Sequence, residues 1–201
     1  MAIIYIIIDR RYIGVIPDFT RPLRSWQKIA KLKRELDFSP SPGLTYYELG
    51  ALQVESGNMN DGRHNLEKAH DLIPDHPDIE YYLGVARIRT GALDAGKIAM
   101  ENALRLNPKI KYGLPYVYLM EYSLRRQESQ DQIEAYLEKI YEYESPELFY
   151  EAGVVFQREG HRERAMEMFR QVPASLKNCP SFLKKQHRYR AFKAKIKSML
   201  I

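Results

Sequence analysis

The residues that most often perform chemistry in proteins are few in this sequence, and their spacing does not bring them together. The five histidines are His64, His70, His76, His161 and His187. The first three lie six residues apart, which places them on different faces of any continuous helix, and no cysteine accompanies them. A metal site needs several such ligands directed at one point. We therefore expect no metal site and no cofactor.

Sequence motifs of catalysis are also missing. We find no glycine-rich phosphate loop, no nucleophile elbow and no motif of paired carboxylates. The single cysteine, Cys179, excludes an internal disulfide and fits a reducing compartment. The sequence shows no secretory signal with a small-residue cleavage site. We expect a cytoplasmic protein that is not an enzyme.

A repeat of 34 residues organises most of the chain. Four small or rigid residues recur at this interval: Gly50, Gly57, Ala69 and Pro74 return as Gly84, Gly91, Ala103 and Pro108. In each copy, apolar residues follow helical spacing up to the second glycine, break there, and resume until the proline. Each copy is therefore predicted to be a helical hairpin, and this period is typical of a solenoid.

The repeat resembles that of the tetratricopeptide repeat (TPR) family. The family's pattern of an aromatic residue, Leu-Gly, Ala and Pro is present at Tyr46, Leu49, Gly50, Gly57, Leu66, Ala69 and Pro74. The resemblance implies an all-α, right-handed superhelix that forms a single elongated domain. Its four hairpins are expected within residues 38–173, at 43–76, 77–110, 114–145 and 146–173. The third copy has lost its glycines, and the 69 residues from Gly84 to Gly153 indicate one inserted residue near it.

Glycine occupies one position of the second helix, at Gly62 and Gly96, where the family usually has alanine. Glycine inside a helix costs about 1 kcal/mol relative to alanine. Because the glycine recurs at the same repeat position, we interpret it as a sign of close helix packing and not of a ligand site.

Tyrosines and arginines recur on the predicted first helices, which line a concave groove in TPR proteins. Aligning the four copies places one tyrosine of each at an equivalent position: Tyr47, Tyr81, Tyr118 and Tyr150. One or two turns further on lie Tyr122, Arg89, Arg125, Arg126 and Arg158. Because Tyr and Arg dominate interface hot spots, these residues are predicted to bind a peptide or helix of a partner protein. In the alternative interpretation, the tyrosines fill the seams between repeats with their hydroxyls at the rim.

Charge is distributed unevenly along the chain, whose net charge is +5. Residues 1–37 hold eight Lys/Arg and four Asp/Glu, residues 38–173 hold fifteen and twenty-two, and residues 174–201 hold eight and none. An acidic body is therefore flanked by two basic ends. Because the acidic body would repel phosphates and no nucleic-acid motif is present, we expect no nucleic-acid partner.

The amino end combines an apolar run with basic residues. The run, residues 2–8, is shorter than the roughly 20 residues that cross a bilayer. Three interpretations of the run remain. It could be a short strand pair or apolar strip packed on the first hairpin, the inner end of a membrane anchor, or a disordered tag. The basic residues predicted to contact an anionic membrane or an acidic partner are Arg10, Arg11, Arg24, Lys28 and Lys31. Residues 22–36 predict an amphipathic helix that either caps the first repeat or lies on lipid.

These patterns favour a scaffold that binds a protein segment in its groove and is held at the cytoplasmic face of a membrane by its amino end. The alternative is a structural module in which the apolar amino end joins copies into a homo-oligomer and the groove stays empty.

The basic segment 174–201 predicts a last helix from Ser181 to Leu200. Its apolar residues are expected to be buried: Phe182, Leu183, Phe192, Ile196 and Met199. Its basic residues are expected to be exposed: Lys184, Lys185, Arg188, Arg190, Lys193, Lys195 and Lys197. Such a helix would cap the solenoid with a soluble face. An acidic partner or an anionic lipid is the functional alternative.

Overall fold

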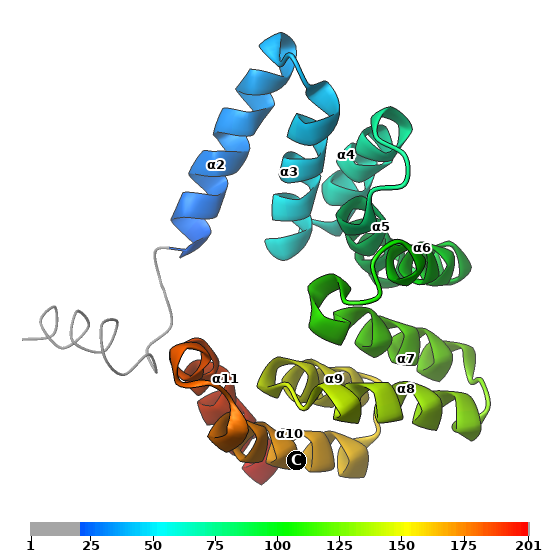
Figure 1. The fold of residues 1–201 in the computed structure, drawn as a ribbon, viewed down its shortest axis with the longest axis vertical. Helices are drawn as coiled ribbons and strands as arrows, with labels where there is room; N and C mark the ends of the chain where they lie inside the picture. The colour runs from blue at the N-terminus through cyan, green and yellow to red at the C-terminus, as the bar shows by residue number, and fades with distance from the viewer. Residues whose placement is uncertain (1–20, 201) are drawn as a thin grey trace, which may run out of the picture. The chain divides into compact units, whose positions relative to one another are not determined.

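The computed structural model describes residues 21–200, which are all-α and contain no strand (Figure 1). The α-helices are α2 (Arg21–Glu35), α3 (Pro42–Glu55), α4 (Met59–Leu72), α5 (Pro77–Arg89), α6 (Leu93–Leu106), α7 (Leu114–Arg126), α8 (Gln130–Tyr143), α9 (Pro146–Arg158), α10 (Arg162–Asn178) and α11 (Ser181–Leu200). Two 3-10 turns, η2 (Leu36–Phe38) and η3 (Ile110–Gly113), precede α3 and α7. The apolar run 2–8 lies outside the described residues, so its interpretations stay predictions.

The helices follow the predicted hairpins, and their ends carry the expected signals. A proline opens α3, α5 and α9, where its missing N–H has no helical partner to lose. The side chains of Asn58 and Ser129 accept hydrogen bonds from backbone N–H groups in the first turns of α4 and α8. Helix α10 differs from the prediction because it continues through Pro173 to Asn178, past the expected end of the fourth repeat.

The described residues form two compact units, 21–122 and 123–200, which divide within α7. The single elongated domain that the repeat pattern predicted stays a prediction. The largest fully buried side chains of the first unit are Leu49, Leu66, Ile79, Leu83, Ile88, Met100 and Met120. Those of the second unit are Ile140, Leu148, Phe156, Met168 and Phe169. Each unit therefore has its own apolar core.

A residue in the left-handed conformation follows the first helix of each hairpin. Gly57, Gly91 and Gly160 have φ between 86° and 90°, a region that glycine enters without a steric cost. Gln127 occupies the same place after α7, with φ of 55°. The hydrogen bonds confirm the equivalence, since the next residue in each turn donates its N–H to a carbonyl five residues earlier. The third copy therefore keeps the turn although it has lost the glycine.

The recurrent glycines of the second helices pack closely against the first helices. A Cβ atom on Gly96 would lie 2.6 Å from Cγ1 of Ile88 and 2.9 Å from its backbone nitrogen. A Cβ atom on Gly62 would lie 2.6 Å from Cγ2 of Val54. The interpretation of these glycines as packing positions is confirmed.

The inserted residue is explained by the turn η3. Gln127 lies 36 residues after Gly91, and Gly160 lies 33 residues after Gln127, so the net gain over two repeats is one residue. Lys111 and Tyr112 have φ of 45° and 50°, so the extra residues are absorbed in a left-handed turn. This turn directs Lys111 toward Asp78, to which its ammonium group pairs at 2.6 Å.

Helix α11 has the bounds that the sequence predicted, but its faces are reversed. Phe182, Phe192, Ile196 and Met199 were expected to be buried, and their exposed fractions are 79%, 49%, 41% and 70%. The most buried side chains of the helix are instead His187, Ala191 and Ala194. The expectation was wrong because the small residues allow α11 to approach its neighbours closely, while long basic side chains on the same face reach acceptors there.

Candidate functional site

Tyrosines of three successive first helices form a connected row in the unit 21–122. The ring of Tyr47 on α3 lies 6.3 Å from that of Tyr82 on α5. Tyr82 contacts its neighbour Tyr81 edge-on at 5.1 Å, and Tyr81 lies 6.0 Å from Tyr118 on α7. These four residues are called the tyrosine row. The structure thus brings together three of the predicted groove residues through Tyr82, which the sequence analysis did not single out.

Two cations lie over the rings of the row. The Lys111 ammonium group is 5.0 Å from the centre of the Tyr82 ring and 5.8 Å from that of Tyr81. The Arg89 guanidinium group is 5.6 Å from the centre of the Tyr118 ring and 3.5 Å from the carboxylate of Glu121. Each cation is thus held by an aromatic ring and by a carboxylate, since Lys111 also pairs with Asp78. Lys111 could not have been found from the repeat, because the irregular turn η3 positions it.

At two successive junctions between repeats, a residue in the last turn of one first helix contacts a tyrosine of the next first helix. The hydroxyl of Tyr82 donates a hydrogen bond of 2.5 Å to Glu55, which lies two residues before the capping Gly57. Arg89, two residues before Gly91, meets Tyr118 in the same relation. The last turn of one first helix therefore holds an aromatic ring of the next.

Burial raises the pKa of two tyrosines of the row, Tyr47 and Tyr82. Burial first, and then the nearby Asp78, Glu55 and Glu48, raise the pKa of Tyr47 to about 12. Burial and the hydrogen bond to Glu55 also raise the pKa of Tyr82 above its usual range. Because both groups stay neutral at physiological pH, their hydroxyls remain hydrogen-bond donors.

The accessible part of the row is smaller than the sequence predicted. Tyr81 and Tyr122 are buried, with exposed fractions of 5% and 8%, whereas Tyr47 and Tyr118 are half-buried. Tyr122 lies off the row, where its hydroxyl donates to Asp94 at 3.1 Å and Lys97 covers its ring. The half-buried rings of Tyr47 and Tyr118 are therefore the ones that a partner can reach.

When the repeats are aligned on their left-handed turn residues, Tyr118 is no longer equivalent to the other three predicted tyrosines. Tyr47, Tyr81 and Tyr150 each lie ten residues before the left-handed residue of their turn. Tyr118 lies nine residues before Gln127, and the buried Val117 takes the equivalent place. The extra residues in η3 moved the register, which the sequence alignment could not show.

His76 adds a polar group to the edge of the row. Its ring lies 5.3 Å from that of Tyr47, and its Nδ1 atom is buried without a hydrogen-bond partner in the protein. The sequence analysis assigned no function to His76. Among residues 21–200 no group of His, Cys, Asp and Glu side chains could hold a metal ion.

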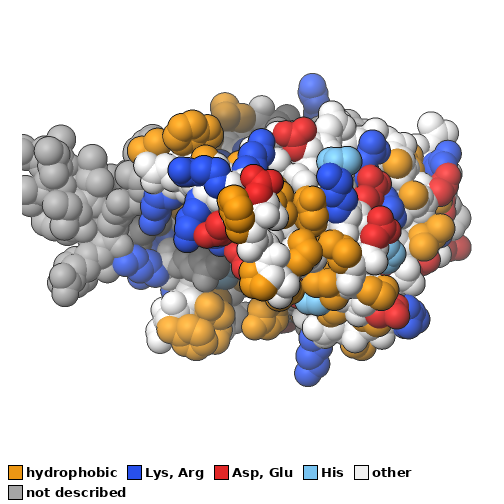
Figure 2. Space-filling model, turned by 90° about the horizontal axis from the view of Figure 1, so that it is seen from above, with side chains coloured by type: hydrophobic (Ala, Val, Ile, Leu, Met, Phe, Trp, Pro, Cys, Tyr) orange, Lys and Arg blue, Asp and Glu red, His pale blue; other side chains and the backbone are white. Residues whose placement is uncertain are grey.

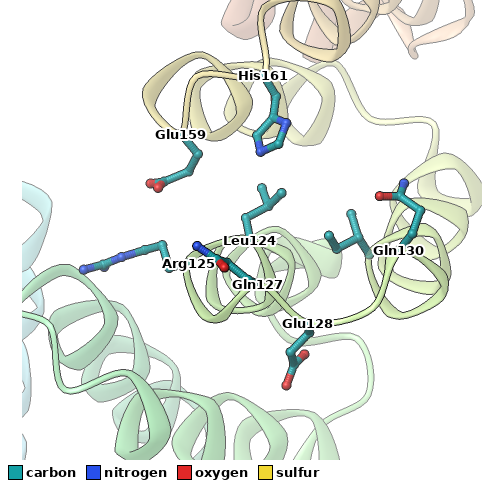
Figure 3. A pocket seen from close by; sticks show the side chains of 8 residues that line it. Leu124, Arg125, Gln127, Glu128, Gln130, Glu159 and His161 are labelled. Atoms are coloured by element: carbon teal, nitrogen blue, oxygen red, sulfur yellow. The ribbon is translucent and has the colours of Figure 1, made fainter.

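The remaining predicted groove residues lie in the unit 123–200. Arg125 lines a hollow of about 600 Å³, together with the apolar Leu124 and Ile133. In Figure 3, His161 points from the turn after α9 toward Leu124. Glu128 and Glu159 also line the hollow, so its charge is mixed. It shows no preference for an acidic or a basic ligand.

The other three predicted residues of this unit do not line the hollow. Tyr150 is buried, with its ring 5.9 Å from that of Phe169. Arg158 pairs with Glu159 at 3.1 Å, and Arg126 is exposed at the end of α7. The nine predicted groove residues therefore divide between the two units.

Two of the predicted basic residues of the amino end, Lys28 and Lys31, pair with carboxylates. Lys28 lies 3.4 Å from Glu48 and Lys31 lies 3.3 Å from Glu35, while Arg24 is exposed. Arg10 and Arg11 lie outside the described residues. Figure 2 shows basic and acidic side chains interspersed over much of the face in view. None of the described helices is long and apolar enough to cross a membrane.

The repeated hairpins, their left-handed turns and their glycine contacts define a TPR-type helical solenoid. Solved structures agree with this assignment of the fold. MamA is 22% identical, with a TM-score of 0.56 over 82% of this chain and 98% of its own. TTC0263, a thermophilic TPR protein of Thermus thermophilus, is 20% identical, with a TM-score of 0.59 over 88% of this chain and 98% of its own.

A third similar structure is YrrB, described as a TPR protein with an unusual peptide-binding site. It is 17% identical, with a TM-score of 0.51 over 84% of both chains. No family model and no curated protein matches the sequence. At these identities the likeness establishes the fold and leaves the function to be argued from the site.

Proposed function

We propose that this protein is a non-enzymatic scaffold that binds a peptide or helix of a partner protein along the tyrosine row. The observation that carries the proposal is the continuity of the row across α3, α5 and α7, with a half-buried tyrosine at each end. Half-buried tyrosines offer a large contact area and lose little conformational entropy when a ligand covers them.

The chemistry of the row favours a peptide with both apolar and acceptor groups. The Tyr47 ring supplies apolar area and a neutral hydroxyl. The Lys111 ammonium group lies beside Tyr81 and Tyr82 and pairs with Asp78, and an N–H that Asp78 does not use could donate to a carbonyl or carboxylate of a bound peptide. The peptide-binding site named for YrrB shows that a protein of this fold binds peptides and supports the same role here.

The competing interpretation is that the tyrosines only fill the seams between repeats. The burial of Tyr81 and the ring contacts within the row are what that interpretation expects. The two interpretations differ at Tyr47 and Tyr118, whose accessible rings a partner would cover. A test must therefore change these two residues and leave the buried ones in place.

The experiment selects peptides from a random display library on the full chain and measures their dissociation constants by calorimetry. Tyr47→Ala and Tyr118→Ala should each weaken binding by about tenfold or more, as expected for interface hot spots. Tyr46→Ala is the matched control, because Tyr46 is a half-buried tyrosine on the same helix as Tyr47, beside Lys68 instead of the row. Equal affinities for all variants, with unchanged circular dichroism, would contradict the proposal.

Tethering to the cytoplasmic face of a membrane by the amino end is the finer form of the proposal. It is supported by α2, where Leu23 and Trp26 are 57% and 65% exposed. Trp26 is the single tryptophan of the chain, so its fluorescence reports on α2 alone. A blue shift on adding phosphatidylserine vesicles is expected if α2 lies on the membrane. If the fluorescence does not shift, α2 does not tether the protein to the membrane.

Self-assembly is the alternative function. Light scattering of the full chain over a range of concentrations would detect it. Oligomers that persist on dilution, together with a library that yields no peptide, would favour a structural module over a peptide-binding scaffold.

A further inference from the structure

Helix α11 presents large apolar side chains to solvent and buries small ones. Its buried side chains are His187, Ala191 and Ala194. Its exposed apolar side chains are Phe182, Phe192, Ile196, Met199 and Leu200. The exposed set recurs at helical spacing from residue 192 onward, so it forms one continuous face. Apolar residues gathered on one exposed face mark an interaction surface.

The inward basic residues hold α11 against its own unit. Arg190 donates to Glu147, and Lys197 donates to Gln157. Lys193 lies 5.7 Å from the centre of the Tyr150 ring. These contacts account for the reversed faces, since the small residues let α11 pack closely and the long basic side chains beside them reach partners on the same unit. The exposed apolar face is therefore a consequence of how α11 is fastened.

Cations accompany the exposed apolar residues. Lys185, Arg188 and Lys195 are exposed on the same side of the helix. Residues 174–201 contain eight Lys/Arg and no Asp/Glu, so no carboxylate in this segment opposes an anionic surface. The charge of the segment thus selects for an anionic partner.

We propose that the exposed face of α11 lies on an anionic membrane surface. In this arrangement Phe192, Ile196 and Met199 enter the boundary between headgroups and acyl chains, and the exposed cations meet lipid phosphates and carboxylates. A bilayer needs no shape complementarity and accepts protruding aromatic and aliphatic side chains beside cations. A second copy of α11 is a poorer occupant, because two such faces would bring like charges together.

The test measures partition of the full chain onto phosphatidylcholine vesicles with and without phosphatidylserine, by flotation. The triple variant Phe192→Gln, Ile196→Gln, Met199→Gln should bind phosphatidylserine vesicles at least tenfold more weakly than the native chain. The matched control is Leu44→Gln, Leu72→Gln, Ile98→Gln, which removes three exposed apolar side chains from the other unit and should bind as the native chain does. All six positions are exposed, so neither variant disturbs a core.

A charge reversal tests the electrostatic contribution to vesicle binding, and a tryptophan at position 192 tests whether α11 itself enters the membrane. Lys185→Glu with Lys195→Glu should remove the preference for phosphatidylserine. Phe192→Trp in a Trp26→Phe background should show a blue shift on phosphatidylserine vesicles, which α2 cannot produce because its tryptophan is gone.

Three results would overturn the proposal. The native chain could fail to bind phosphatidylserine vesicles, or the triple α11 variant could bind as well as the control. The third is a dimer that the triple variant abolishes in the absence of vesicle binding, which would assign the face to a second copy. None of these results depends on the tyrosine row, so this proposal and the proposed peptide binding can fail separately.

Discussion

The hairpins α5–α6 and α9–α10 have the same turn but differ where their helices meet. In α5–α6 both helices contribute glycine, and a Cβ atom on Gly96 would lie 3.2 Å from the carbonyl oxygen of Gly84. In α9–α10 the first helix keeps Gly153, and Ala165 takes the place of the second glycine. Ala165 is fully buried, so its methyl group fits there. The α5–α6 hairpin therefore has glycine at a position where the α9–α10 hairpin has alanine.

The difference shows how the same fold is reached with different helix contacts. On the first helices, Gly84 and Gly153 face the side chains of Met100 and Phe169, whereas Gly96 on the second helix lies against the backbone of Ile88. A ring can be accommodated by a small shift, but a backbone atom moves only with its helix. Backbone contact thus requires glycine at position 96 of α6, whereas α10 accommodates the methyl group of Ala165 at the equivalent position.

The largest effect is expected for Gly96→Val. Its Cβ would already lie 2.9 Å from a backbone nitrogen, and two further methyl groups deepen the overlap. We expect a loss of about 3 kcal/mol in the free energy of unfolding, measured by urea denaturation. Gly84→Val is the matched control, because the three atoms nearest to its new Cβ all belong to the flexible Met100 side chain, and it should cost less. Equal losses for both would remove the distinction between backbone and side-chain contact.

The reciprocal change is Ala165→Gly. It removes a buried methyl group and a good helix former, so the unfolding free energy should fall by about 1.5 kcal/mol. If α9–α10 instead closes up as α5–α6 does, the loss will be near the propensity difference of about 1 kcal/mol. Urea denaturation of the variant beside the native chain distinguishes the two outcomes.

Gln127 extends the comparison to the turns. A non-glycine residue in the left-handed region costs about 1 kcal/mol, so Gln127→Gly should stabilise the chain by that amount. Gly91→Gln should destabilise it by a similar amount, since Gly91 has the same turn with φ of 90°. Thermal midpoints of the two variants should move in opposite directions. A fall in both would mean that the Gln127 side chain contributes more than its backbone costs.

The smallest expected effect is a pH dependence of stability in the unit 123–200, which contains His187. Burial, and then the charge of Arg190, lower the pKa of His187 below 6.5, opposed by Glu147. In the unfolded chain His187 therefore binds a proton near pH 6.5, whereas in the folded chain it binds one only at lower pH. The free energy of unfolding consequently falls as the pH drops through 6.5. Hydrogen exchange in α10 and α11 should quicken between about pH 7.5 and 5.5 beyond its intrinsic rate. His187→Gln should reduce this pH dependence, and an unchanged dependence in the variant would exclude His187 as its source.

Local features were well predicted because they depend on few residues. The bounds of α11 and the turns at Gly57 and Gly91 followed from apolar spacing, glycine and proline. The packing role of Gly62 and Gly96 followed from their recurrence alone. The tyrosines were placed on the correct helices, although the position of Tyr118 was shifted by one residue.

The tyrosine row could be predicted only in part. The sequence analysis found Tyr47, Tyr81 and Tyr118 but gave no reason to choose Tyr82, which joins them. Lys111 reaches the row because η3 turns through left-handed conformations that its residues do not favour. Contacts of this kind depend on the path of a loop, and repeat spacing does not contain that information.

The sequence by itself determined the repeat, the helices and the turns, because helical periodicity and backbone preference act over a few neighbouring residues. Only the tertiary structure decided which side of α11 is buried, which tyrosines remain accessible and where the chain divides into units. These features depend on how closely helices approach. That distance is set by side chains brought together from distant parts of the chain.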